Sequence, residues 1–307
     1  MEEKEGSVWS IFTDKTETIK EASVHRGLFY PVELIVFIAL YLLNMMLLIP
    51  LAARPFLRII DLKSTSQKML LSLFITIILA VFFILYPIFV QKRPMSGIGF
   101  TTTRVNPFRE YGKGLLYGFL MISAAILANV AIGGTHFIGF GGVSVLPYVL
   151  LCLFGFMIQG MEEEIVTRGF FMVSICRRYP AWLGILLNSL LFGLMHLLNP
   201  GVTFISTLNT ILAGILFSLI FLKRDSIWMV SAIHTAWNFS QSNIYGQSTS
   251  GLDLIPSLFK MDAPTGYNWV NGGSYGVEAS IITTTFFSVL ILYLIFKKRN
   301  KLSYPLA

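Results

Sequence analysis

The sequence is poor in charged residues and in cysteine. Only 13% of its 307 residues are Asp, Glu, Lys or Arg, whereas 55% are hydrophobic and the mean hydropathy is +0.71. This balance excludes an ordinary soluble domain and indicates a membrane protein. The two cysteines, Cys152 and Cys176, lie in or beside apolar runs, so a disulfide framework and a thiolate metal site are excluded. We interpret both as small core residues.

The N-terminal segment also lacks the features of a cleaved signal. It begins MEEKEG, without a basic start or a continuous apolar stretch, so we expect it to be retained. Residues 1–28 are predicted to form a cytoplasmic tail or an interfacial helix, the latter suggested by the apolar residues between Val8 and Phe12. Residues 29–301 are predicted to form a single membrane-embedded domain, because no internal repeat or low-complexity segment divides them.

Long apolar runs recur along the chain, and each of them is long enough to supply the ~20 residues that a membrane-spanning helix needs. The sequence therefore predicts an all-α fold, a polytopic membrane bundle of about eight transmembrane helices. The predicted spans are 31–53, 69–90, 115–132, 143–175, 181–198, 202–222, 227–245 and 279–296. The fourth is too long for an upright span, so it must tilt, kink near Gly160 or protrude from the membrane.

The distribution of basic residues predicts the orientation of these spans. With eight crossings, and counted from Lys20 onward, fifteen Lys and Arg fall on the side of the termini and five on the other side. Because cytoplasmic loops carry the excess of basic residues, both termini are predicted to be cytoplasmic. The first loop, which holds four of the five, runs against this trend. The net charge of +7 (23 minus 16) is explained by this topology, so we expect no nucleic-acid partner.

Ionisable residues within the predicted spans are concentrated in three of them. The fourth span contains Glu162-Glu163-Glu164 and Arg168, the fifth contains His196, and the seventh contains His234 and Asn238. Charged groups inside a bilayer are costly, so those that are present usually face the protein interior and act there. These three spans are therefore the candidates for a functional site.

Helix geometry sorts the polar residues of the fourth span into two sets. Gln159, Glu163 and Thr167 follow each other at intervals of four residues and share one face. Glu164 and Arg168 are also four residues apart, in the order that favours an ion pair. This pairing neutralises Glu164 and leaves Glu163 as the free carboxylate.

The other two spans each present one polar stripe at a similar depth. The stripes are Asn188, Phe192 and His196 in one span, and Ser231, His234, Asn238 and Gln241 in the other. At 1.5 Å per residue, Glu163 lies roughly 18 Å, His196 roughly 23 Å and the seventh-span pair roughly 10 to 17 Å from the cytoplasmic ends. These depths permit one shared cavity. There a carboxylate and one histidine can activate water, and a second histidine with the asparagine can bind an oxyanion.

Taken singly, each of these residues has an ordinary structural explanation. Arg168 with Glu164 suits an ion pair that holds helices together, either histidine suits a hydrogen-bonded core position, and Asn238 suits a bond between helices. Their concentration in three of eight spans at matching depth favours a functional site instead.

The three motifs resemble those of a known family. Glu-Glu-x-x-x-Arg, Phe-x-x-x-His and His-x-x-x-Asn, in this order, are similar to the CAAX prenyl endopeptidases of the Ras-converting type, whose bacterial branch is called CPBP or Abi and includes bacteriocin self-immunity proteins. The motifs span Met161 to Asn238. Outside them, only the eight-span layout and the segment from Gly272 to Glu278 look like the bacterial branch.

The resemblance implies an all-helical intramembrane endopeptidase with a cavity open to the cytosolic face. It implies that Glu163 and His196 activate water, that His234 and Asn238 form the oxyanion site, and that Glu164 and Arg168 support them. Three consecutive glutamates make the register ambiguous, and only the spacing to Arg168 selects Glu163 and Glu164. The expected partners are the lipid bilayer and a membrane-associated peptide or protein substrate, in a bacterial plasma membrane.

Several alternatives stay open from the sequence. A metalloprotease would use Glu163, His196 and His234 as zinc ligands, although the sequence has no His-Glu-x-x-His helix. We therefore expect no tightly bound metal cofactor, with zinc as the alternative. A non-catalytic immunity or scaffold protein is a further hypothesis. A transporter is disfavoured because no inverted repeat is present. The substrate is either a prenylated C-terminal peptide or another membrane peptide.

Overall fold

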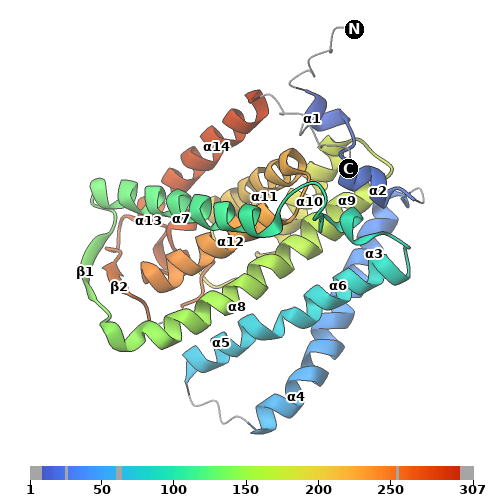
Figure 1. The fold of residues 1–307 in the computed structure, drawn as a ribbon. Coiled ribbons are helices and arrows are strands. Elements are labelled where there is room, and N and C mark those ends of the chain that lie inside the picture. The colour runs from blue at the N-terminus through green and yellow to red at the C-terminus, as the bar shows by residue number, and fades with distance from the viewer. Residues whose placement is uncertain (1–8, 25–26, 60–63, 254–255, 298–307) are drawn as a thin grey trace.

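The described part of the chain forms a bundle of helices with very little strand (Figure 1). The computed structural model describes residues 9–24, 27–59, 64–253 and 256–297. The predicted all-α membrane bundle is confirmed. Residues 1–8 of the predicted tail and 298–301 of the predicted domain lie outside the described residues.

All eight predicted spans are helical. In chain order they correspond to α3, η1 and α4 (Tyr30–Leu43, Asn44–Leu48, Ile49–Ile59), α5 and α6 (Thr65–Ile75, Ile77–Phe89), α7 (Pro107–Ala131), α8, η4 and α9 (Leu146–Glu164, Ile165–Met172, Val173–Cys176), α10 (Ala181–Met195), α11 (Phe204–Arg224), α12 and η5 (Trp228–Phe239, Ser240–Ile244) and α14 (Ile281–Phe296).

Five of the corresponding helices are long and apolar enough to cross a membrane, and two are apolar but shorter. The five are Tyr30–Pro55, Ser66–Phe89, Pro107–Ala131, Val143–Cys176 and Phe204–Arg224, and the two are Ala181–Met195 and Ile281–Phe296. α12 belongs to neither group, because its 12 residues include His234, Asn238 and other polar side chains. Its polarity is tolerated because the whole helix is enclosed by its neighbours: every residue from Met229 to Asn238 is buried.

Short elements connect the spans. They are α1 (Ser10–Thr13), α2 (Glu17–Ala22), η2 (Met95–Ile98), β1 (His136–Phe140), η3 (Val143–Val145), β2 (Phe259–Asp262), α13 (Asn268–Asn271), η6 (Gly273–Tyr275) and η7 (Val277–Ala279). The strands pair antiparallel, with His136 opposite Asp262. This small sheet is a difference from the all-α fold predicted from the sequence, which contained no strand.

The long fourth segment does not kink at Gly160. α8 passes through Gly160 as a regular helix and then widens into a π-helix, η4, over Ile165–Met172. A π-helical turn is rare and is often found at functional sites. Here it begins immediately after the three consecutive glutamates.

Glycines let three helices pack with their backbones in contact. A Cβ atom added at Gly160 of α8 would lie 2.8 Å from the backbone nitrogen of Thr235 in α12. On the opposite side of α12, Cβ atoms at Gly114 and Gly118 of α7 would lie 2.5 and 2.4 Å from the carbonyl oxygens of Met229 and Ile233. Small residues at this spacing allow close approach of membrane helices. They hold α12 between α7 and α8, next to the glutamates.

α1, α2 and the C-terminal end of α14 lie at one end of the bundle (Figure 1). α2 docks there through Thr18, whose backbone N–H donates to Asp225 Oδ1 at 3.0 Å. Lys15 Nζ donates to the carbonyl oxygen of Arg177 at 2.6 Å, and Lys223 Nζ donates to that of Lys297. β1, β2 and α13 lie at the other end (Figure 1). The described residues of the predicted tail thus form short helices packed on the bundle.

Candidate functional site

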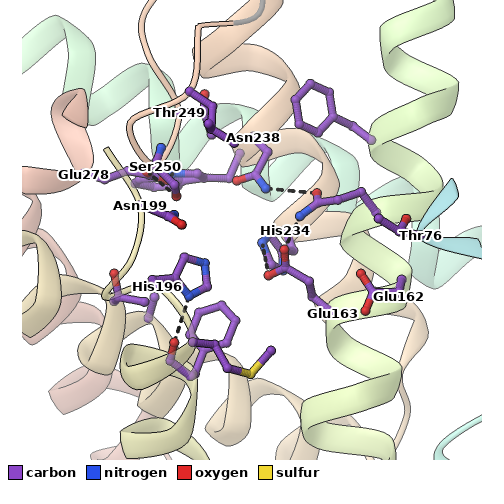
Figure 2. Close-up of a pocket in the computed structure, with 18 of the residues that line it drawn as sticks. Thr76, Glu162, Glu163, His196, Asn199, His234, Asn238, Thr249, Ser250 and Glu278 are labelled. Atoms are coloured by element: carbon purple, nitrogen blue, oxygen red, sulfur yellow. Dashed lines mark hydrogen bonds and ion pairs between the residues drawn. The ribbon is translucent and has the colours of Figure 1, made fainter. Parts of the chain in front are cut away.

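A cavity of about 330 Å³ lies between the helices that carry the three motifs (Figure 2). Its polar lining includes Gln159, Glu162, Glu163, His196, Asn199, Asn209, Thr210, His234, Asn238, Thr249, Ser250 and Glu278. Its apolar lining includes Tyr41 from α3 and Met45 from η1, together with Phe156, Phe192 and Trp237. All four residues predicted to act in catalysis therefore face one cavity, as their matching depths indicate.

Only one oxygen of the Glu163 carboxylate accepts a hydrogen bond from a described residue. Gln159 Nε2 donates to its Oε1, and Gln159 Oε1 accepts from Asn238 Nδ2 at 3.2 Å. No group in the described residues donates a hydrogen bond to Glu163 Oε2, and the side chain is 18% exposed. Gln159 thus connects Glu163 of α8 with Asn238 of α12. The spacing of four residues indicated the contact with Glu163, but not the one with Asn238.

His234 lies between two carboxylates. Its Nδ1 is 2.9 Å from Glu164 Oε1, and its Nε2 is 3.6 Å from Glu163 Oε2. Because the Glu164 carboxylate can only accept, Nδ1 carries the proton of that hydrogen bond. Nε2 then faces the cavity and Glu163, and the bond of Nδ1 to Glu164 fixes the plane of the ring.

The expected pair of Glu164 and Arg168 is present and fully buried. Arg168 Nη1 donates to Glu164 Oε1 at 2.8 Å and to Thr167 Oγ1 at 2.9 Å, and both charged side chains are 0% exposed. The guanidinium carbon also lies 4.5 Å from the centre of the Phe192 ring. Arg168, Glu164 and His234 therefore form one continuous chain of charge-assisted contacts.

His196 enters the cavity from a different wall. It is the C-cap residue that follows α10, and its Nδ1 lies 2.8 Å from the carbonyl oxygen of Phe192, one turn earlier. The ring centres of Phe192 and His196 are 4.7 Å apart. Figure 2 shows His196 separated from Glu163 by the open part of the cavity. Of the two histidines, His234 is the one that contacts Glu163, through Nε2 at 3.6 Å from Oε2.

Glu278 is a cavity residue that the motif analysis did not single out by itself. Trp237 Nε1 donates to its Oε1 at 3.0 Å, and the Ser250 N–H and O–H donate to its Oε2 at 2.7 and 2.9 Å. Burial raises the pKa of the Glu278 carboxyl, although these donors and the nearby charge of His196 partly offset the effect. The only signal in the sequence was the segment from Gly272 to Glu278 that looks like the bacterial branch.

The ligand set of the alternative zinc site was also tested against the geometry. That site would require Glu163, His196 and His234 to converge on one ion. Within the described ranges, no three His, Cys, Asp or Glu side chains are grouped closely enough to hold a metal. The residues as arranged do not fit the zinc site, so no step below uses a metal.

Comparison with known proteins gives one family. Residues 145–240 match the family model described as type II CAAX prenyl endopeptidase Rce1-like. The resemblance to the CAAX prenyl endopeptidases is confirmed. The match covers under a third of the 307 residues, and it includes all of the predicted catalytic and supporting positions. No curated protein and no solved structure matches the chain.

The match to this family model supports a protease in general, and the five long apolar helices support an integral membrane protein. The matched segment contains the cavity residues Glu163, His196, His234 and Asn238, whereas the cavity residue Glu278 lies outside it.

Proposed function

We propose that this chain hydrolyses peptide bonds of membrane-associated substrates with water activated by Glu163 and His196. The observation that carries the proposal is the half-held Glu163 carboxylate. Gln159 fixes one oxygen, and the other, Oε2, accepts no hydrogen bond in the described residues and lies 3.6 Å from His234 Nε2. A carboxylate oriented in this way can accept a proton from water. His196, on the opposite wall, is placed to share the proton and pass it to the leaving amine.

In this proposal, His234 and Asn238 bind the oxyanion of the tetrahedral intermediate. In its doubly protonated form, the ring of His234 offers Nε2–H to the cavity while Nδ1–H stays bound to Glu164. Asn238 has one N–H engaged with Gln159, and its other N–H is available for the same oxyanion. Glu164 and Arg168 act through His234, because they fix its ring from behind.

We assign the protein, as part of the same proposal, to the bacterial branch of the family and to the plasma membrane. The support is the segment from Gly272 to Glu278, which places Glu278 in the cavity wall. A role in self-immunity to a bacteriocin would be one use of such an activity.

The test is cleavage of defined membrane peptides by the purified protein in lipid vesicles. Wild type should cleave, and Glu163→Gln should not, because the amide cannot take a proton from water. Glu162→Gln is the matched control, since it makes the same carboxyl-to-amide change one position away. The activity should persist in a strong chelator. Zinc that is present in stoichiometric amounts and lost together with activity would contradict the mechanism.

Equal activity of Glu163→Gln and wild type would refute the role of this carboxylate. Binding of peptides without any cleavage would favour the non-catalytic alternative, a protein that protects or holds a partner.

A further inference from the structure

Glu162 carries a buried carboxyl group that has no partner in the described part of the chain. The residue is 4% exposed and lines the cavity. No hydrogen bond or ion pair joins its side chain to another described residue. Buried polar groups in proteins nearly always have such a partner, and each exception calls for an explanation. The partner of this group is therefore expected among molecules that enter the cavity.

The other glutamates near the cavity differ from Glu162 in this respect. Glu163 accepts a hydrogen bond from Gln159, and Glu164 accepts one from Arg168. Glu278 accepts three, two of them at one oxygen. Of the four carboxyl groups, only that of Glu162 makes no hydrogen bond with a described residue.

The surroundings of Glu162 favour the neutral form of its carboxyl group. No Lys or Arg is among the described residues that line the cavity, and the next two residues of the chain are also glutamates. A buried charge without a cation is costly, and like charges repel strongly in a medium of low dielectric constant. A neutral carboxyl group has one O–H donor and one carbonyl acceptor. It therefore suits a partner that also offers one donor and one acceptor side by side.

An extended peptide backbone offers this pair of groups. The N–H and C=O of one residue point to the same side, so that facing residues of antiparallel strands exchange two hydrogen bonds. Inside a bilayer these groups are normally satisfied within a helix. A helical substrate has to unwind locally before water can attack one of its peptide bonds, and unwinding leaves N–H and C=O groups without partners. The cavity has to replace the lost hydrogen bonds.

Glu162 lies beside the carboxylate that is proposed to take a proton from water. Glu162 and Glu163 are consecutive residues of α8, and Figure 2 shows Glu162 next to Glu163 on the side of Thr76. Tyr41 of α3 lies within electrostatic reach of both glutamates, and its hydroxyl makes no hydrogen bond with a described residue. Two polar groups without partners in the described chain thus lie on one side of the proposed point of attack.

We propose that Glu162 binds the backbone of one substrate residue beside the bond that is cut, donating its O–H to the C=O of that residue and accepting from its N–H. The hydroxyl of Tyr41 bonds the same stretch of backbone. This inference rests on the proposed function for the position of the cut. It gives Glu162 a role in substrate binding that differs from the roles of Glu163 and Glu164.

The experiment measures equilibrium binding of a fluorescently labelled membrane peptide in phosphatidylcholine vesicles. All proteins carry Glu163→Gln, so that the peptide stays intact. Adding Glu162→Met, which keeps the length of the side chain and removes both hydrogen bonds, should weaken binding roughly tenfold, as expected for two neutral hydrogen bonds. Adding Glu162→Gln, which keeps a donor and an acceptor, should restore most of the affinity. Adding Glu17→Met on α2, where the side chain is 48% exposed, is the control and should change nothing.

A change in the peptide tests the contact with the backbone. N-methylation of one peptide group at a time removes a single N–H and leaves every side chain in place. At one position, close to the bond that wild type cuts, it should weaken binding to the Glu163→Gln protein several-fold. In the protein that also carries Glu162→Met, the same methylation should have no further effect. Glu162→Met should unfold at the same or a higher temperature, because it removes a buried polar group without a partner, whereas a structural role predicts a lower one.

The outcomes separate this inference from the proposed function. Equal losses in Glu162→Gln and Glu162→Met would overturn the inference, because a charge would then be needed. Unchanged binding in Glu162→Met, methylation effects that do not depend on Glu162, or no binding of any peptide would overturn it as well. Cleavage that needs Glu163 would keep the proposed function in each of these cases. The expected coupling without cleavage by wild type would support the inference and count against the function.

Discussion

The three consecutive glutamates have three different surroundings, because each step along a helix turns the side chain by about 100°. Glu164 is fully enclosed with Arg168, Glu163 is partly exposed to the cavity, and Glu162 is buried in the cavity wall at 4% exposure. The spacing to Arg168 predicted the first two surroundings. The sequence could not predict that Glu162 also lines the cavity, since that depends on which helices pack against α8.

Replacing Glu163 should separate activity from folding. Glu163→Gln is expected to abolish peptide cleavage and to leave the thermal unfolding of the protein in detergent almost unchanged, because the amide can keep the bond to Gln159. Glu162→Gln should have the smaller effect on cleavage. The reverse order of effects would show that the register taken from the motif is wrong by one residue.

Replacing either partner of the buried ion pair should mainly affect stability. Arg168→Ala leaves Glu164 as an unpaired buried charge, a change that typically costs about 3 to 5 kcal/mol. We expect a clearly lowered unfolding midpoint and weak expression, for Glu164→Gln as well as Arg168→Ala. If both variants unfold like wild type while losing activity, the pair acts in the reaction and does not hold the helices together.

The oxyanion role makes a quantitative prediction for Asn238. Loss of one donor to an oxyanion costs roughly 100- to 1000-fold in rate, so Asn238→Ala should remain folded and cleave slowly. The rate of a single turnover on a saturating membrane peptide is the measurement. A variant as fast as wild type would remove Asn238 from the oxyanion site.

Some contacts between site residues lie within one helix, and others join two helices. The bond from Arg168 to Glu164 follows from a spacing of four residues and was predictable. The bonds from His234 to Glu164 and from Asn238 to Gln159 join different helices, so they depend on how α12 is rotated against α8. Glu278 is farther still in sequence, and no periodicity connects it to the motifs.

At the scale of elements, two π-helical segments follow the site residues. η4 follows the glutamates, and η5 (Ser240–Ile244) follows the helix that carries His234 and Asn238. A π-turn widens the helix and changes the direction in which later side chains point. The sequence indicated only that the fourth span was too long. Its one candidate position, a kink near Gly160, was wrong, because a π-turn and an α-turn use the same residue types and the pattern cannot locate the change.

The packing of α7 on α12 provides a matched test. A Cβ at Gly114 would lie 2.5 Å from the carbonyl oxygen of Met229, whereas one at Gly112, on the exposed side of the same helix, meets nothing within 4 Å. Gly114→Ala should therefore lower the unfolding temperature and the cleavage rate together, since α12 carries two site residues. Gly112→Ala should be neutral or slightly stabilising, by up to about 1 kcal/mol. Equal effects of the two substitutions would contradict the tight contact.

At the scale of the whole molecule, apolar run length was enough to find every long helix. It was not enough for β1, β2 and the short helices around Glu278, because these segments are fixed by contacts such as Asn271 Nδ2 with the carbonyl oxygen of Gly134. The predicted tail likewise packs on the bundle through Thr18 and Asp225, a contact between residues 207 positions apart.

The topology prediction can be tested on the same scale. α2 and Lys297 lie at one end of the bundle, so tags placed before α1 and after α14 should be accessible from the same side of the membrane. The excess of basic residues predicts that this side is cytoplasmic. A cysteine introduced at Lys260 of β2 should be labelled only from the opposite side. Tags that report from different sides would contradict the eight-span arrangement.

The cavity is lined by Ser250, from the segment between η5 and β2, and by Glu278, from η7 between α13 and α14. In Figure 1, β2 and α13 lie away from the end occupied by α1 and α2. With cytoplasmic termini, these segments face the exterior of the cell, whereas the family resemblance implied a cavity open to the cytosol. A polar inhibitor shaped to fit against Ser250 would then act on intact cells without permeating the lipid. Cleaved fragments with a polar end would likewise be shed into the medium.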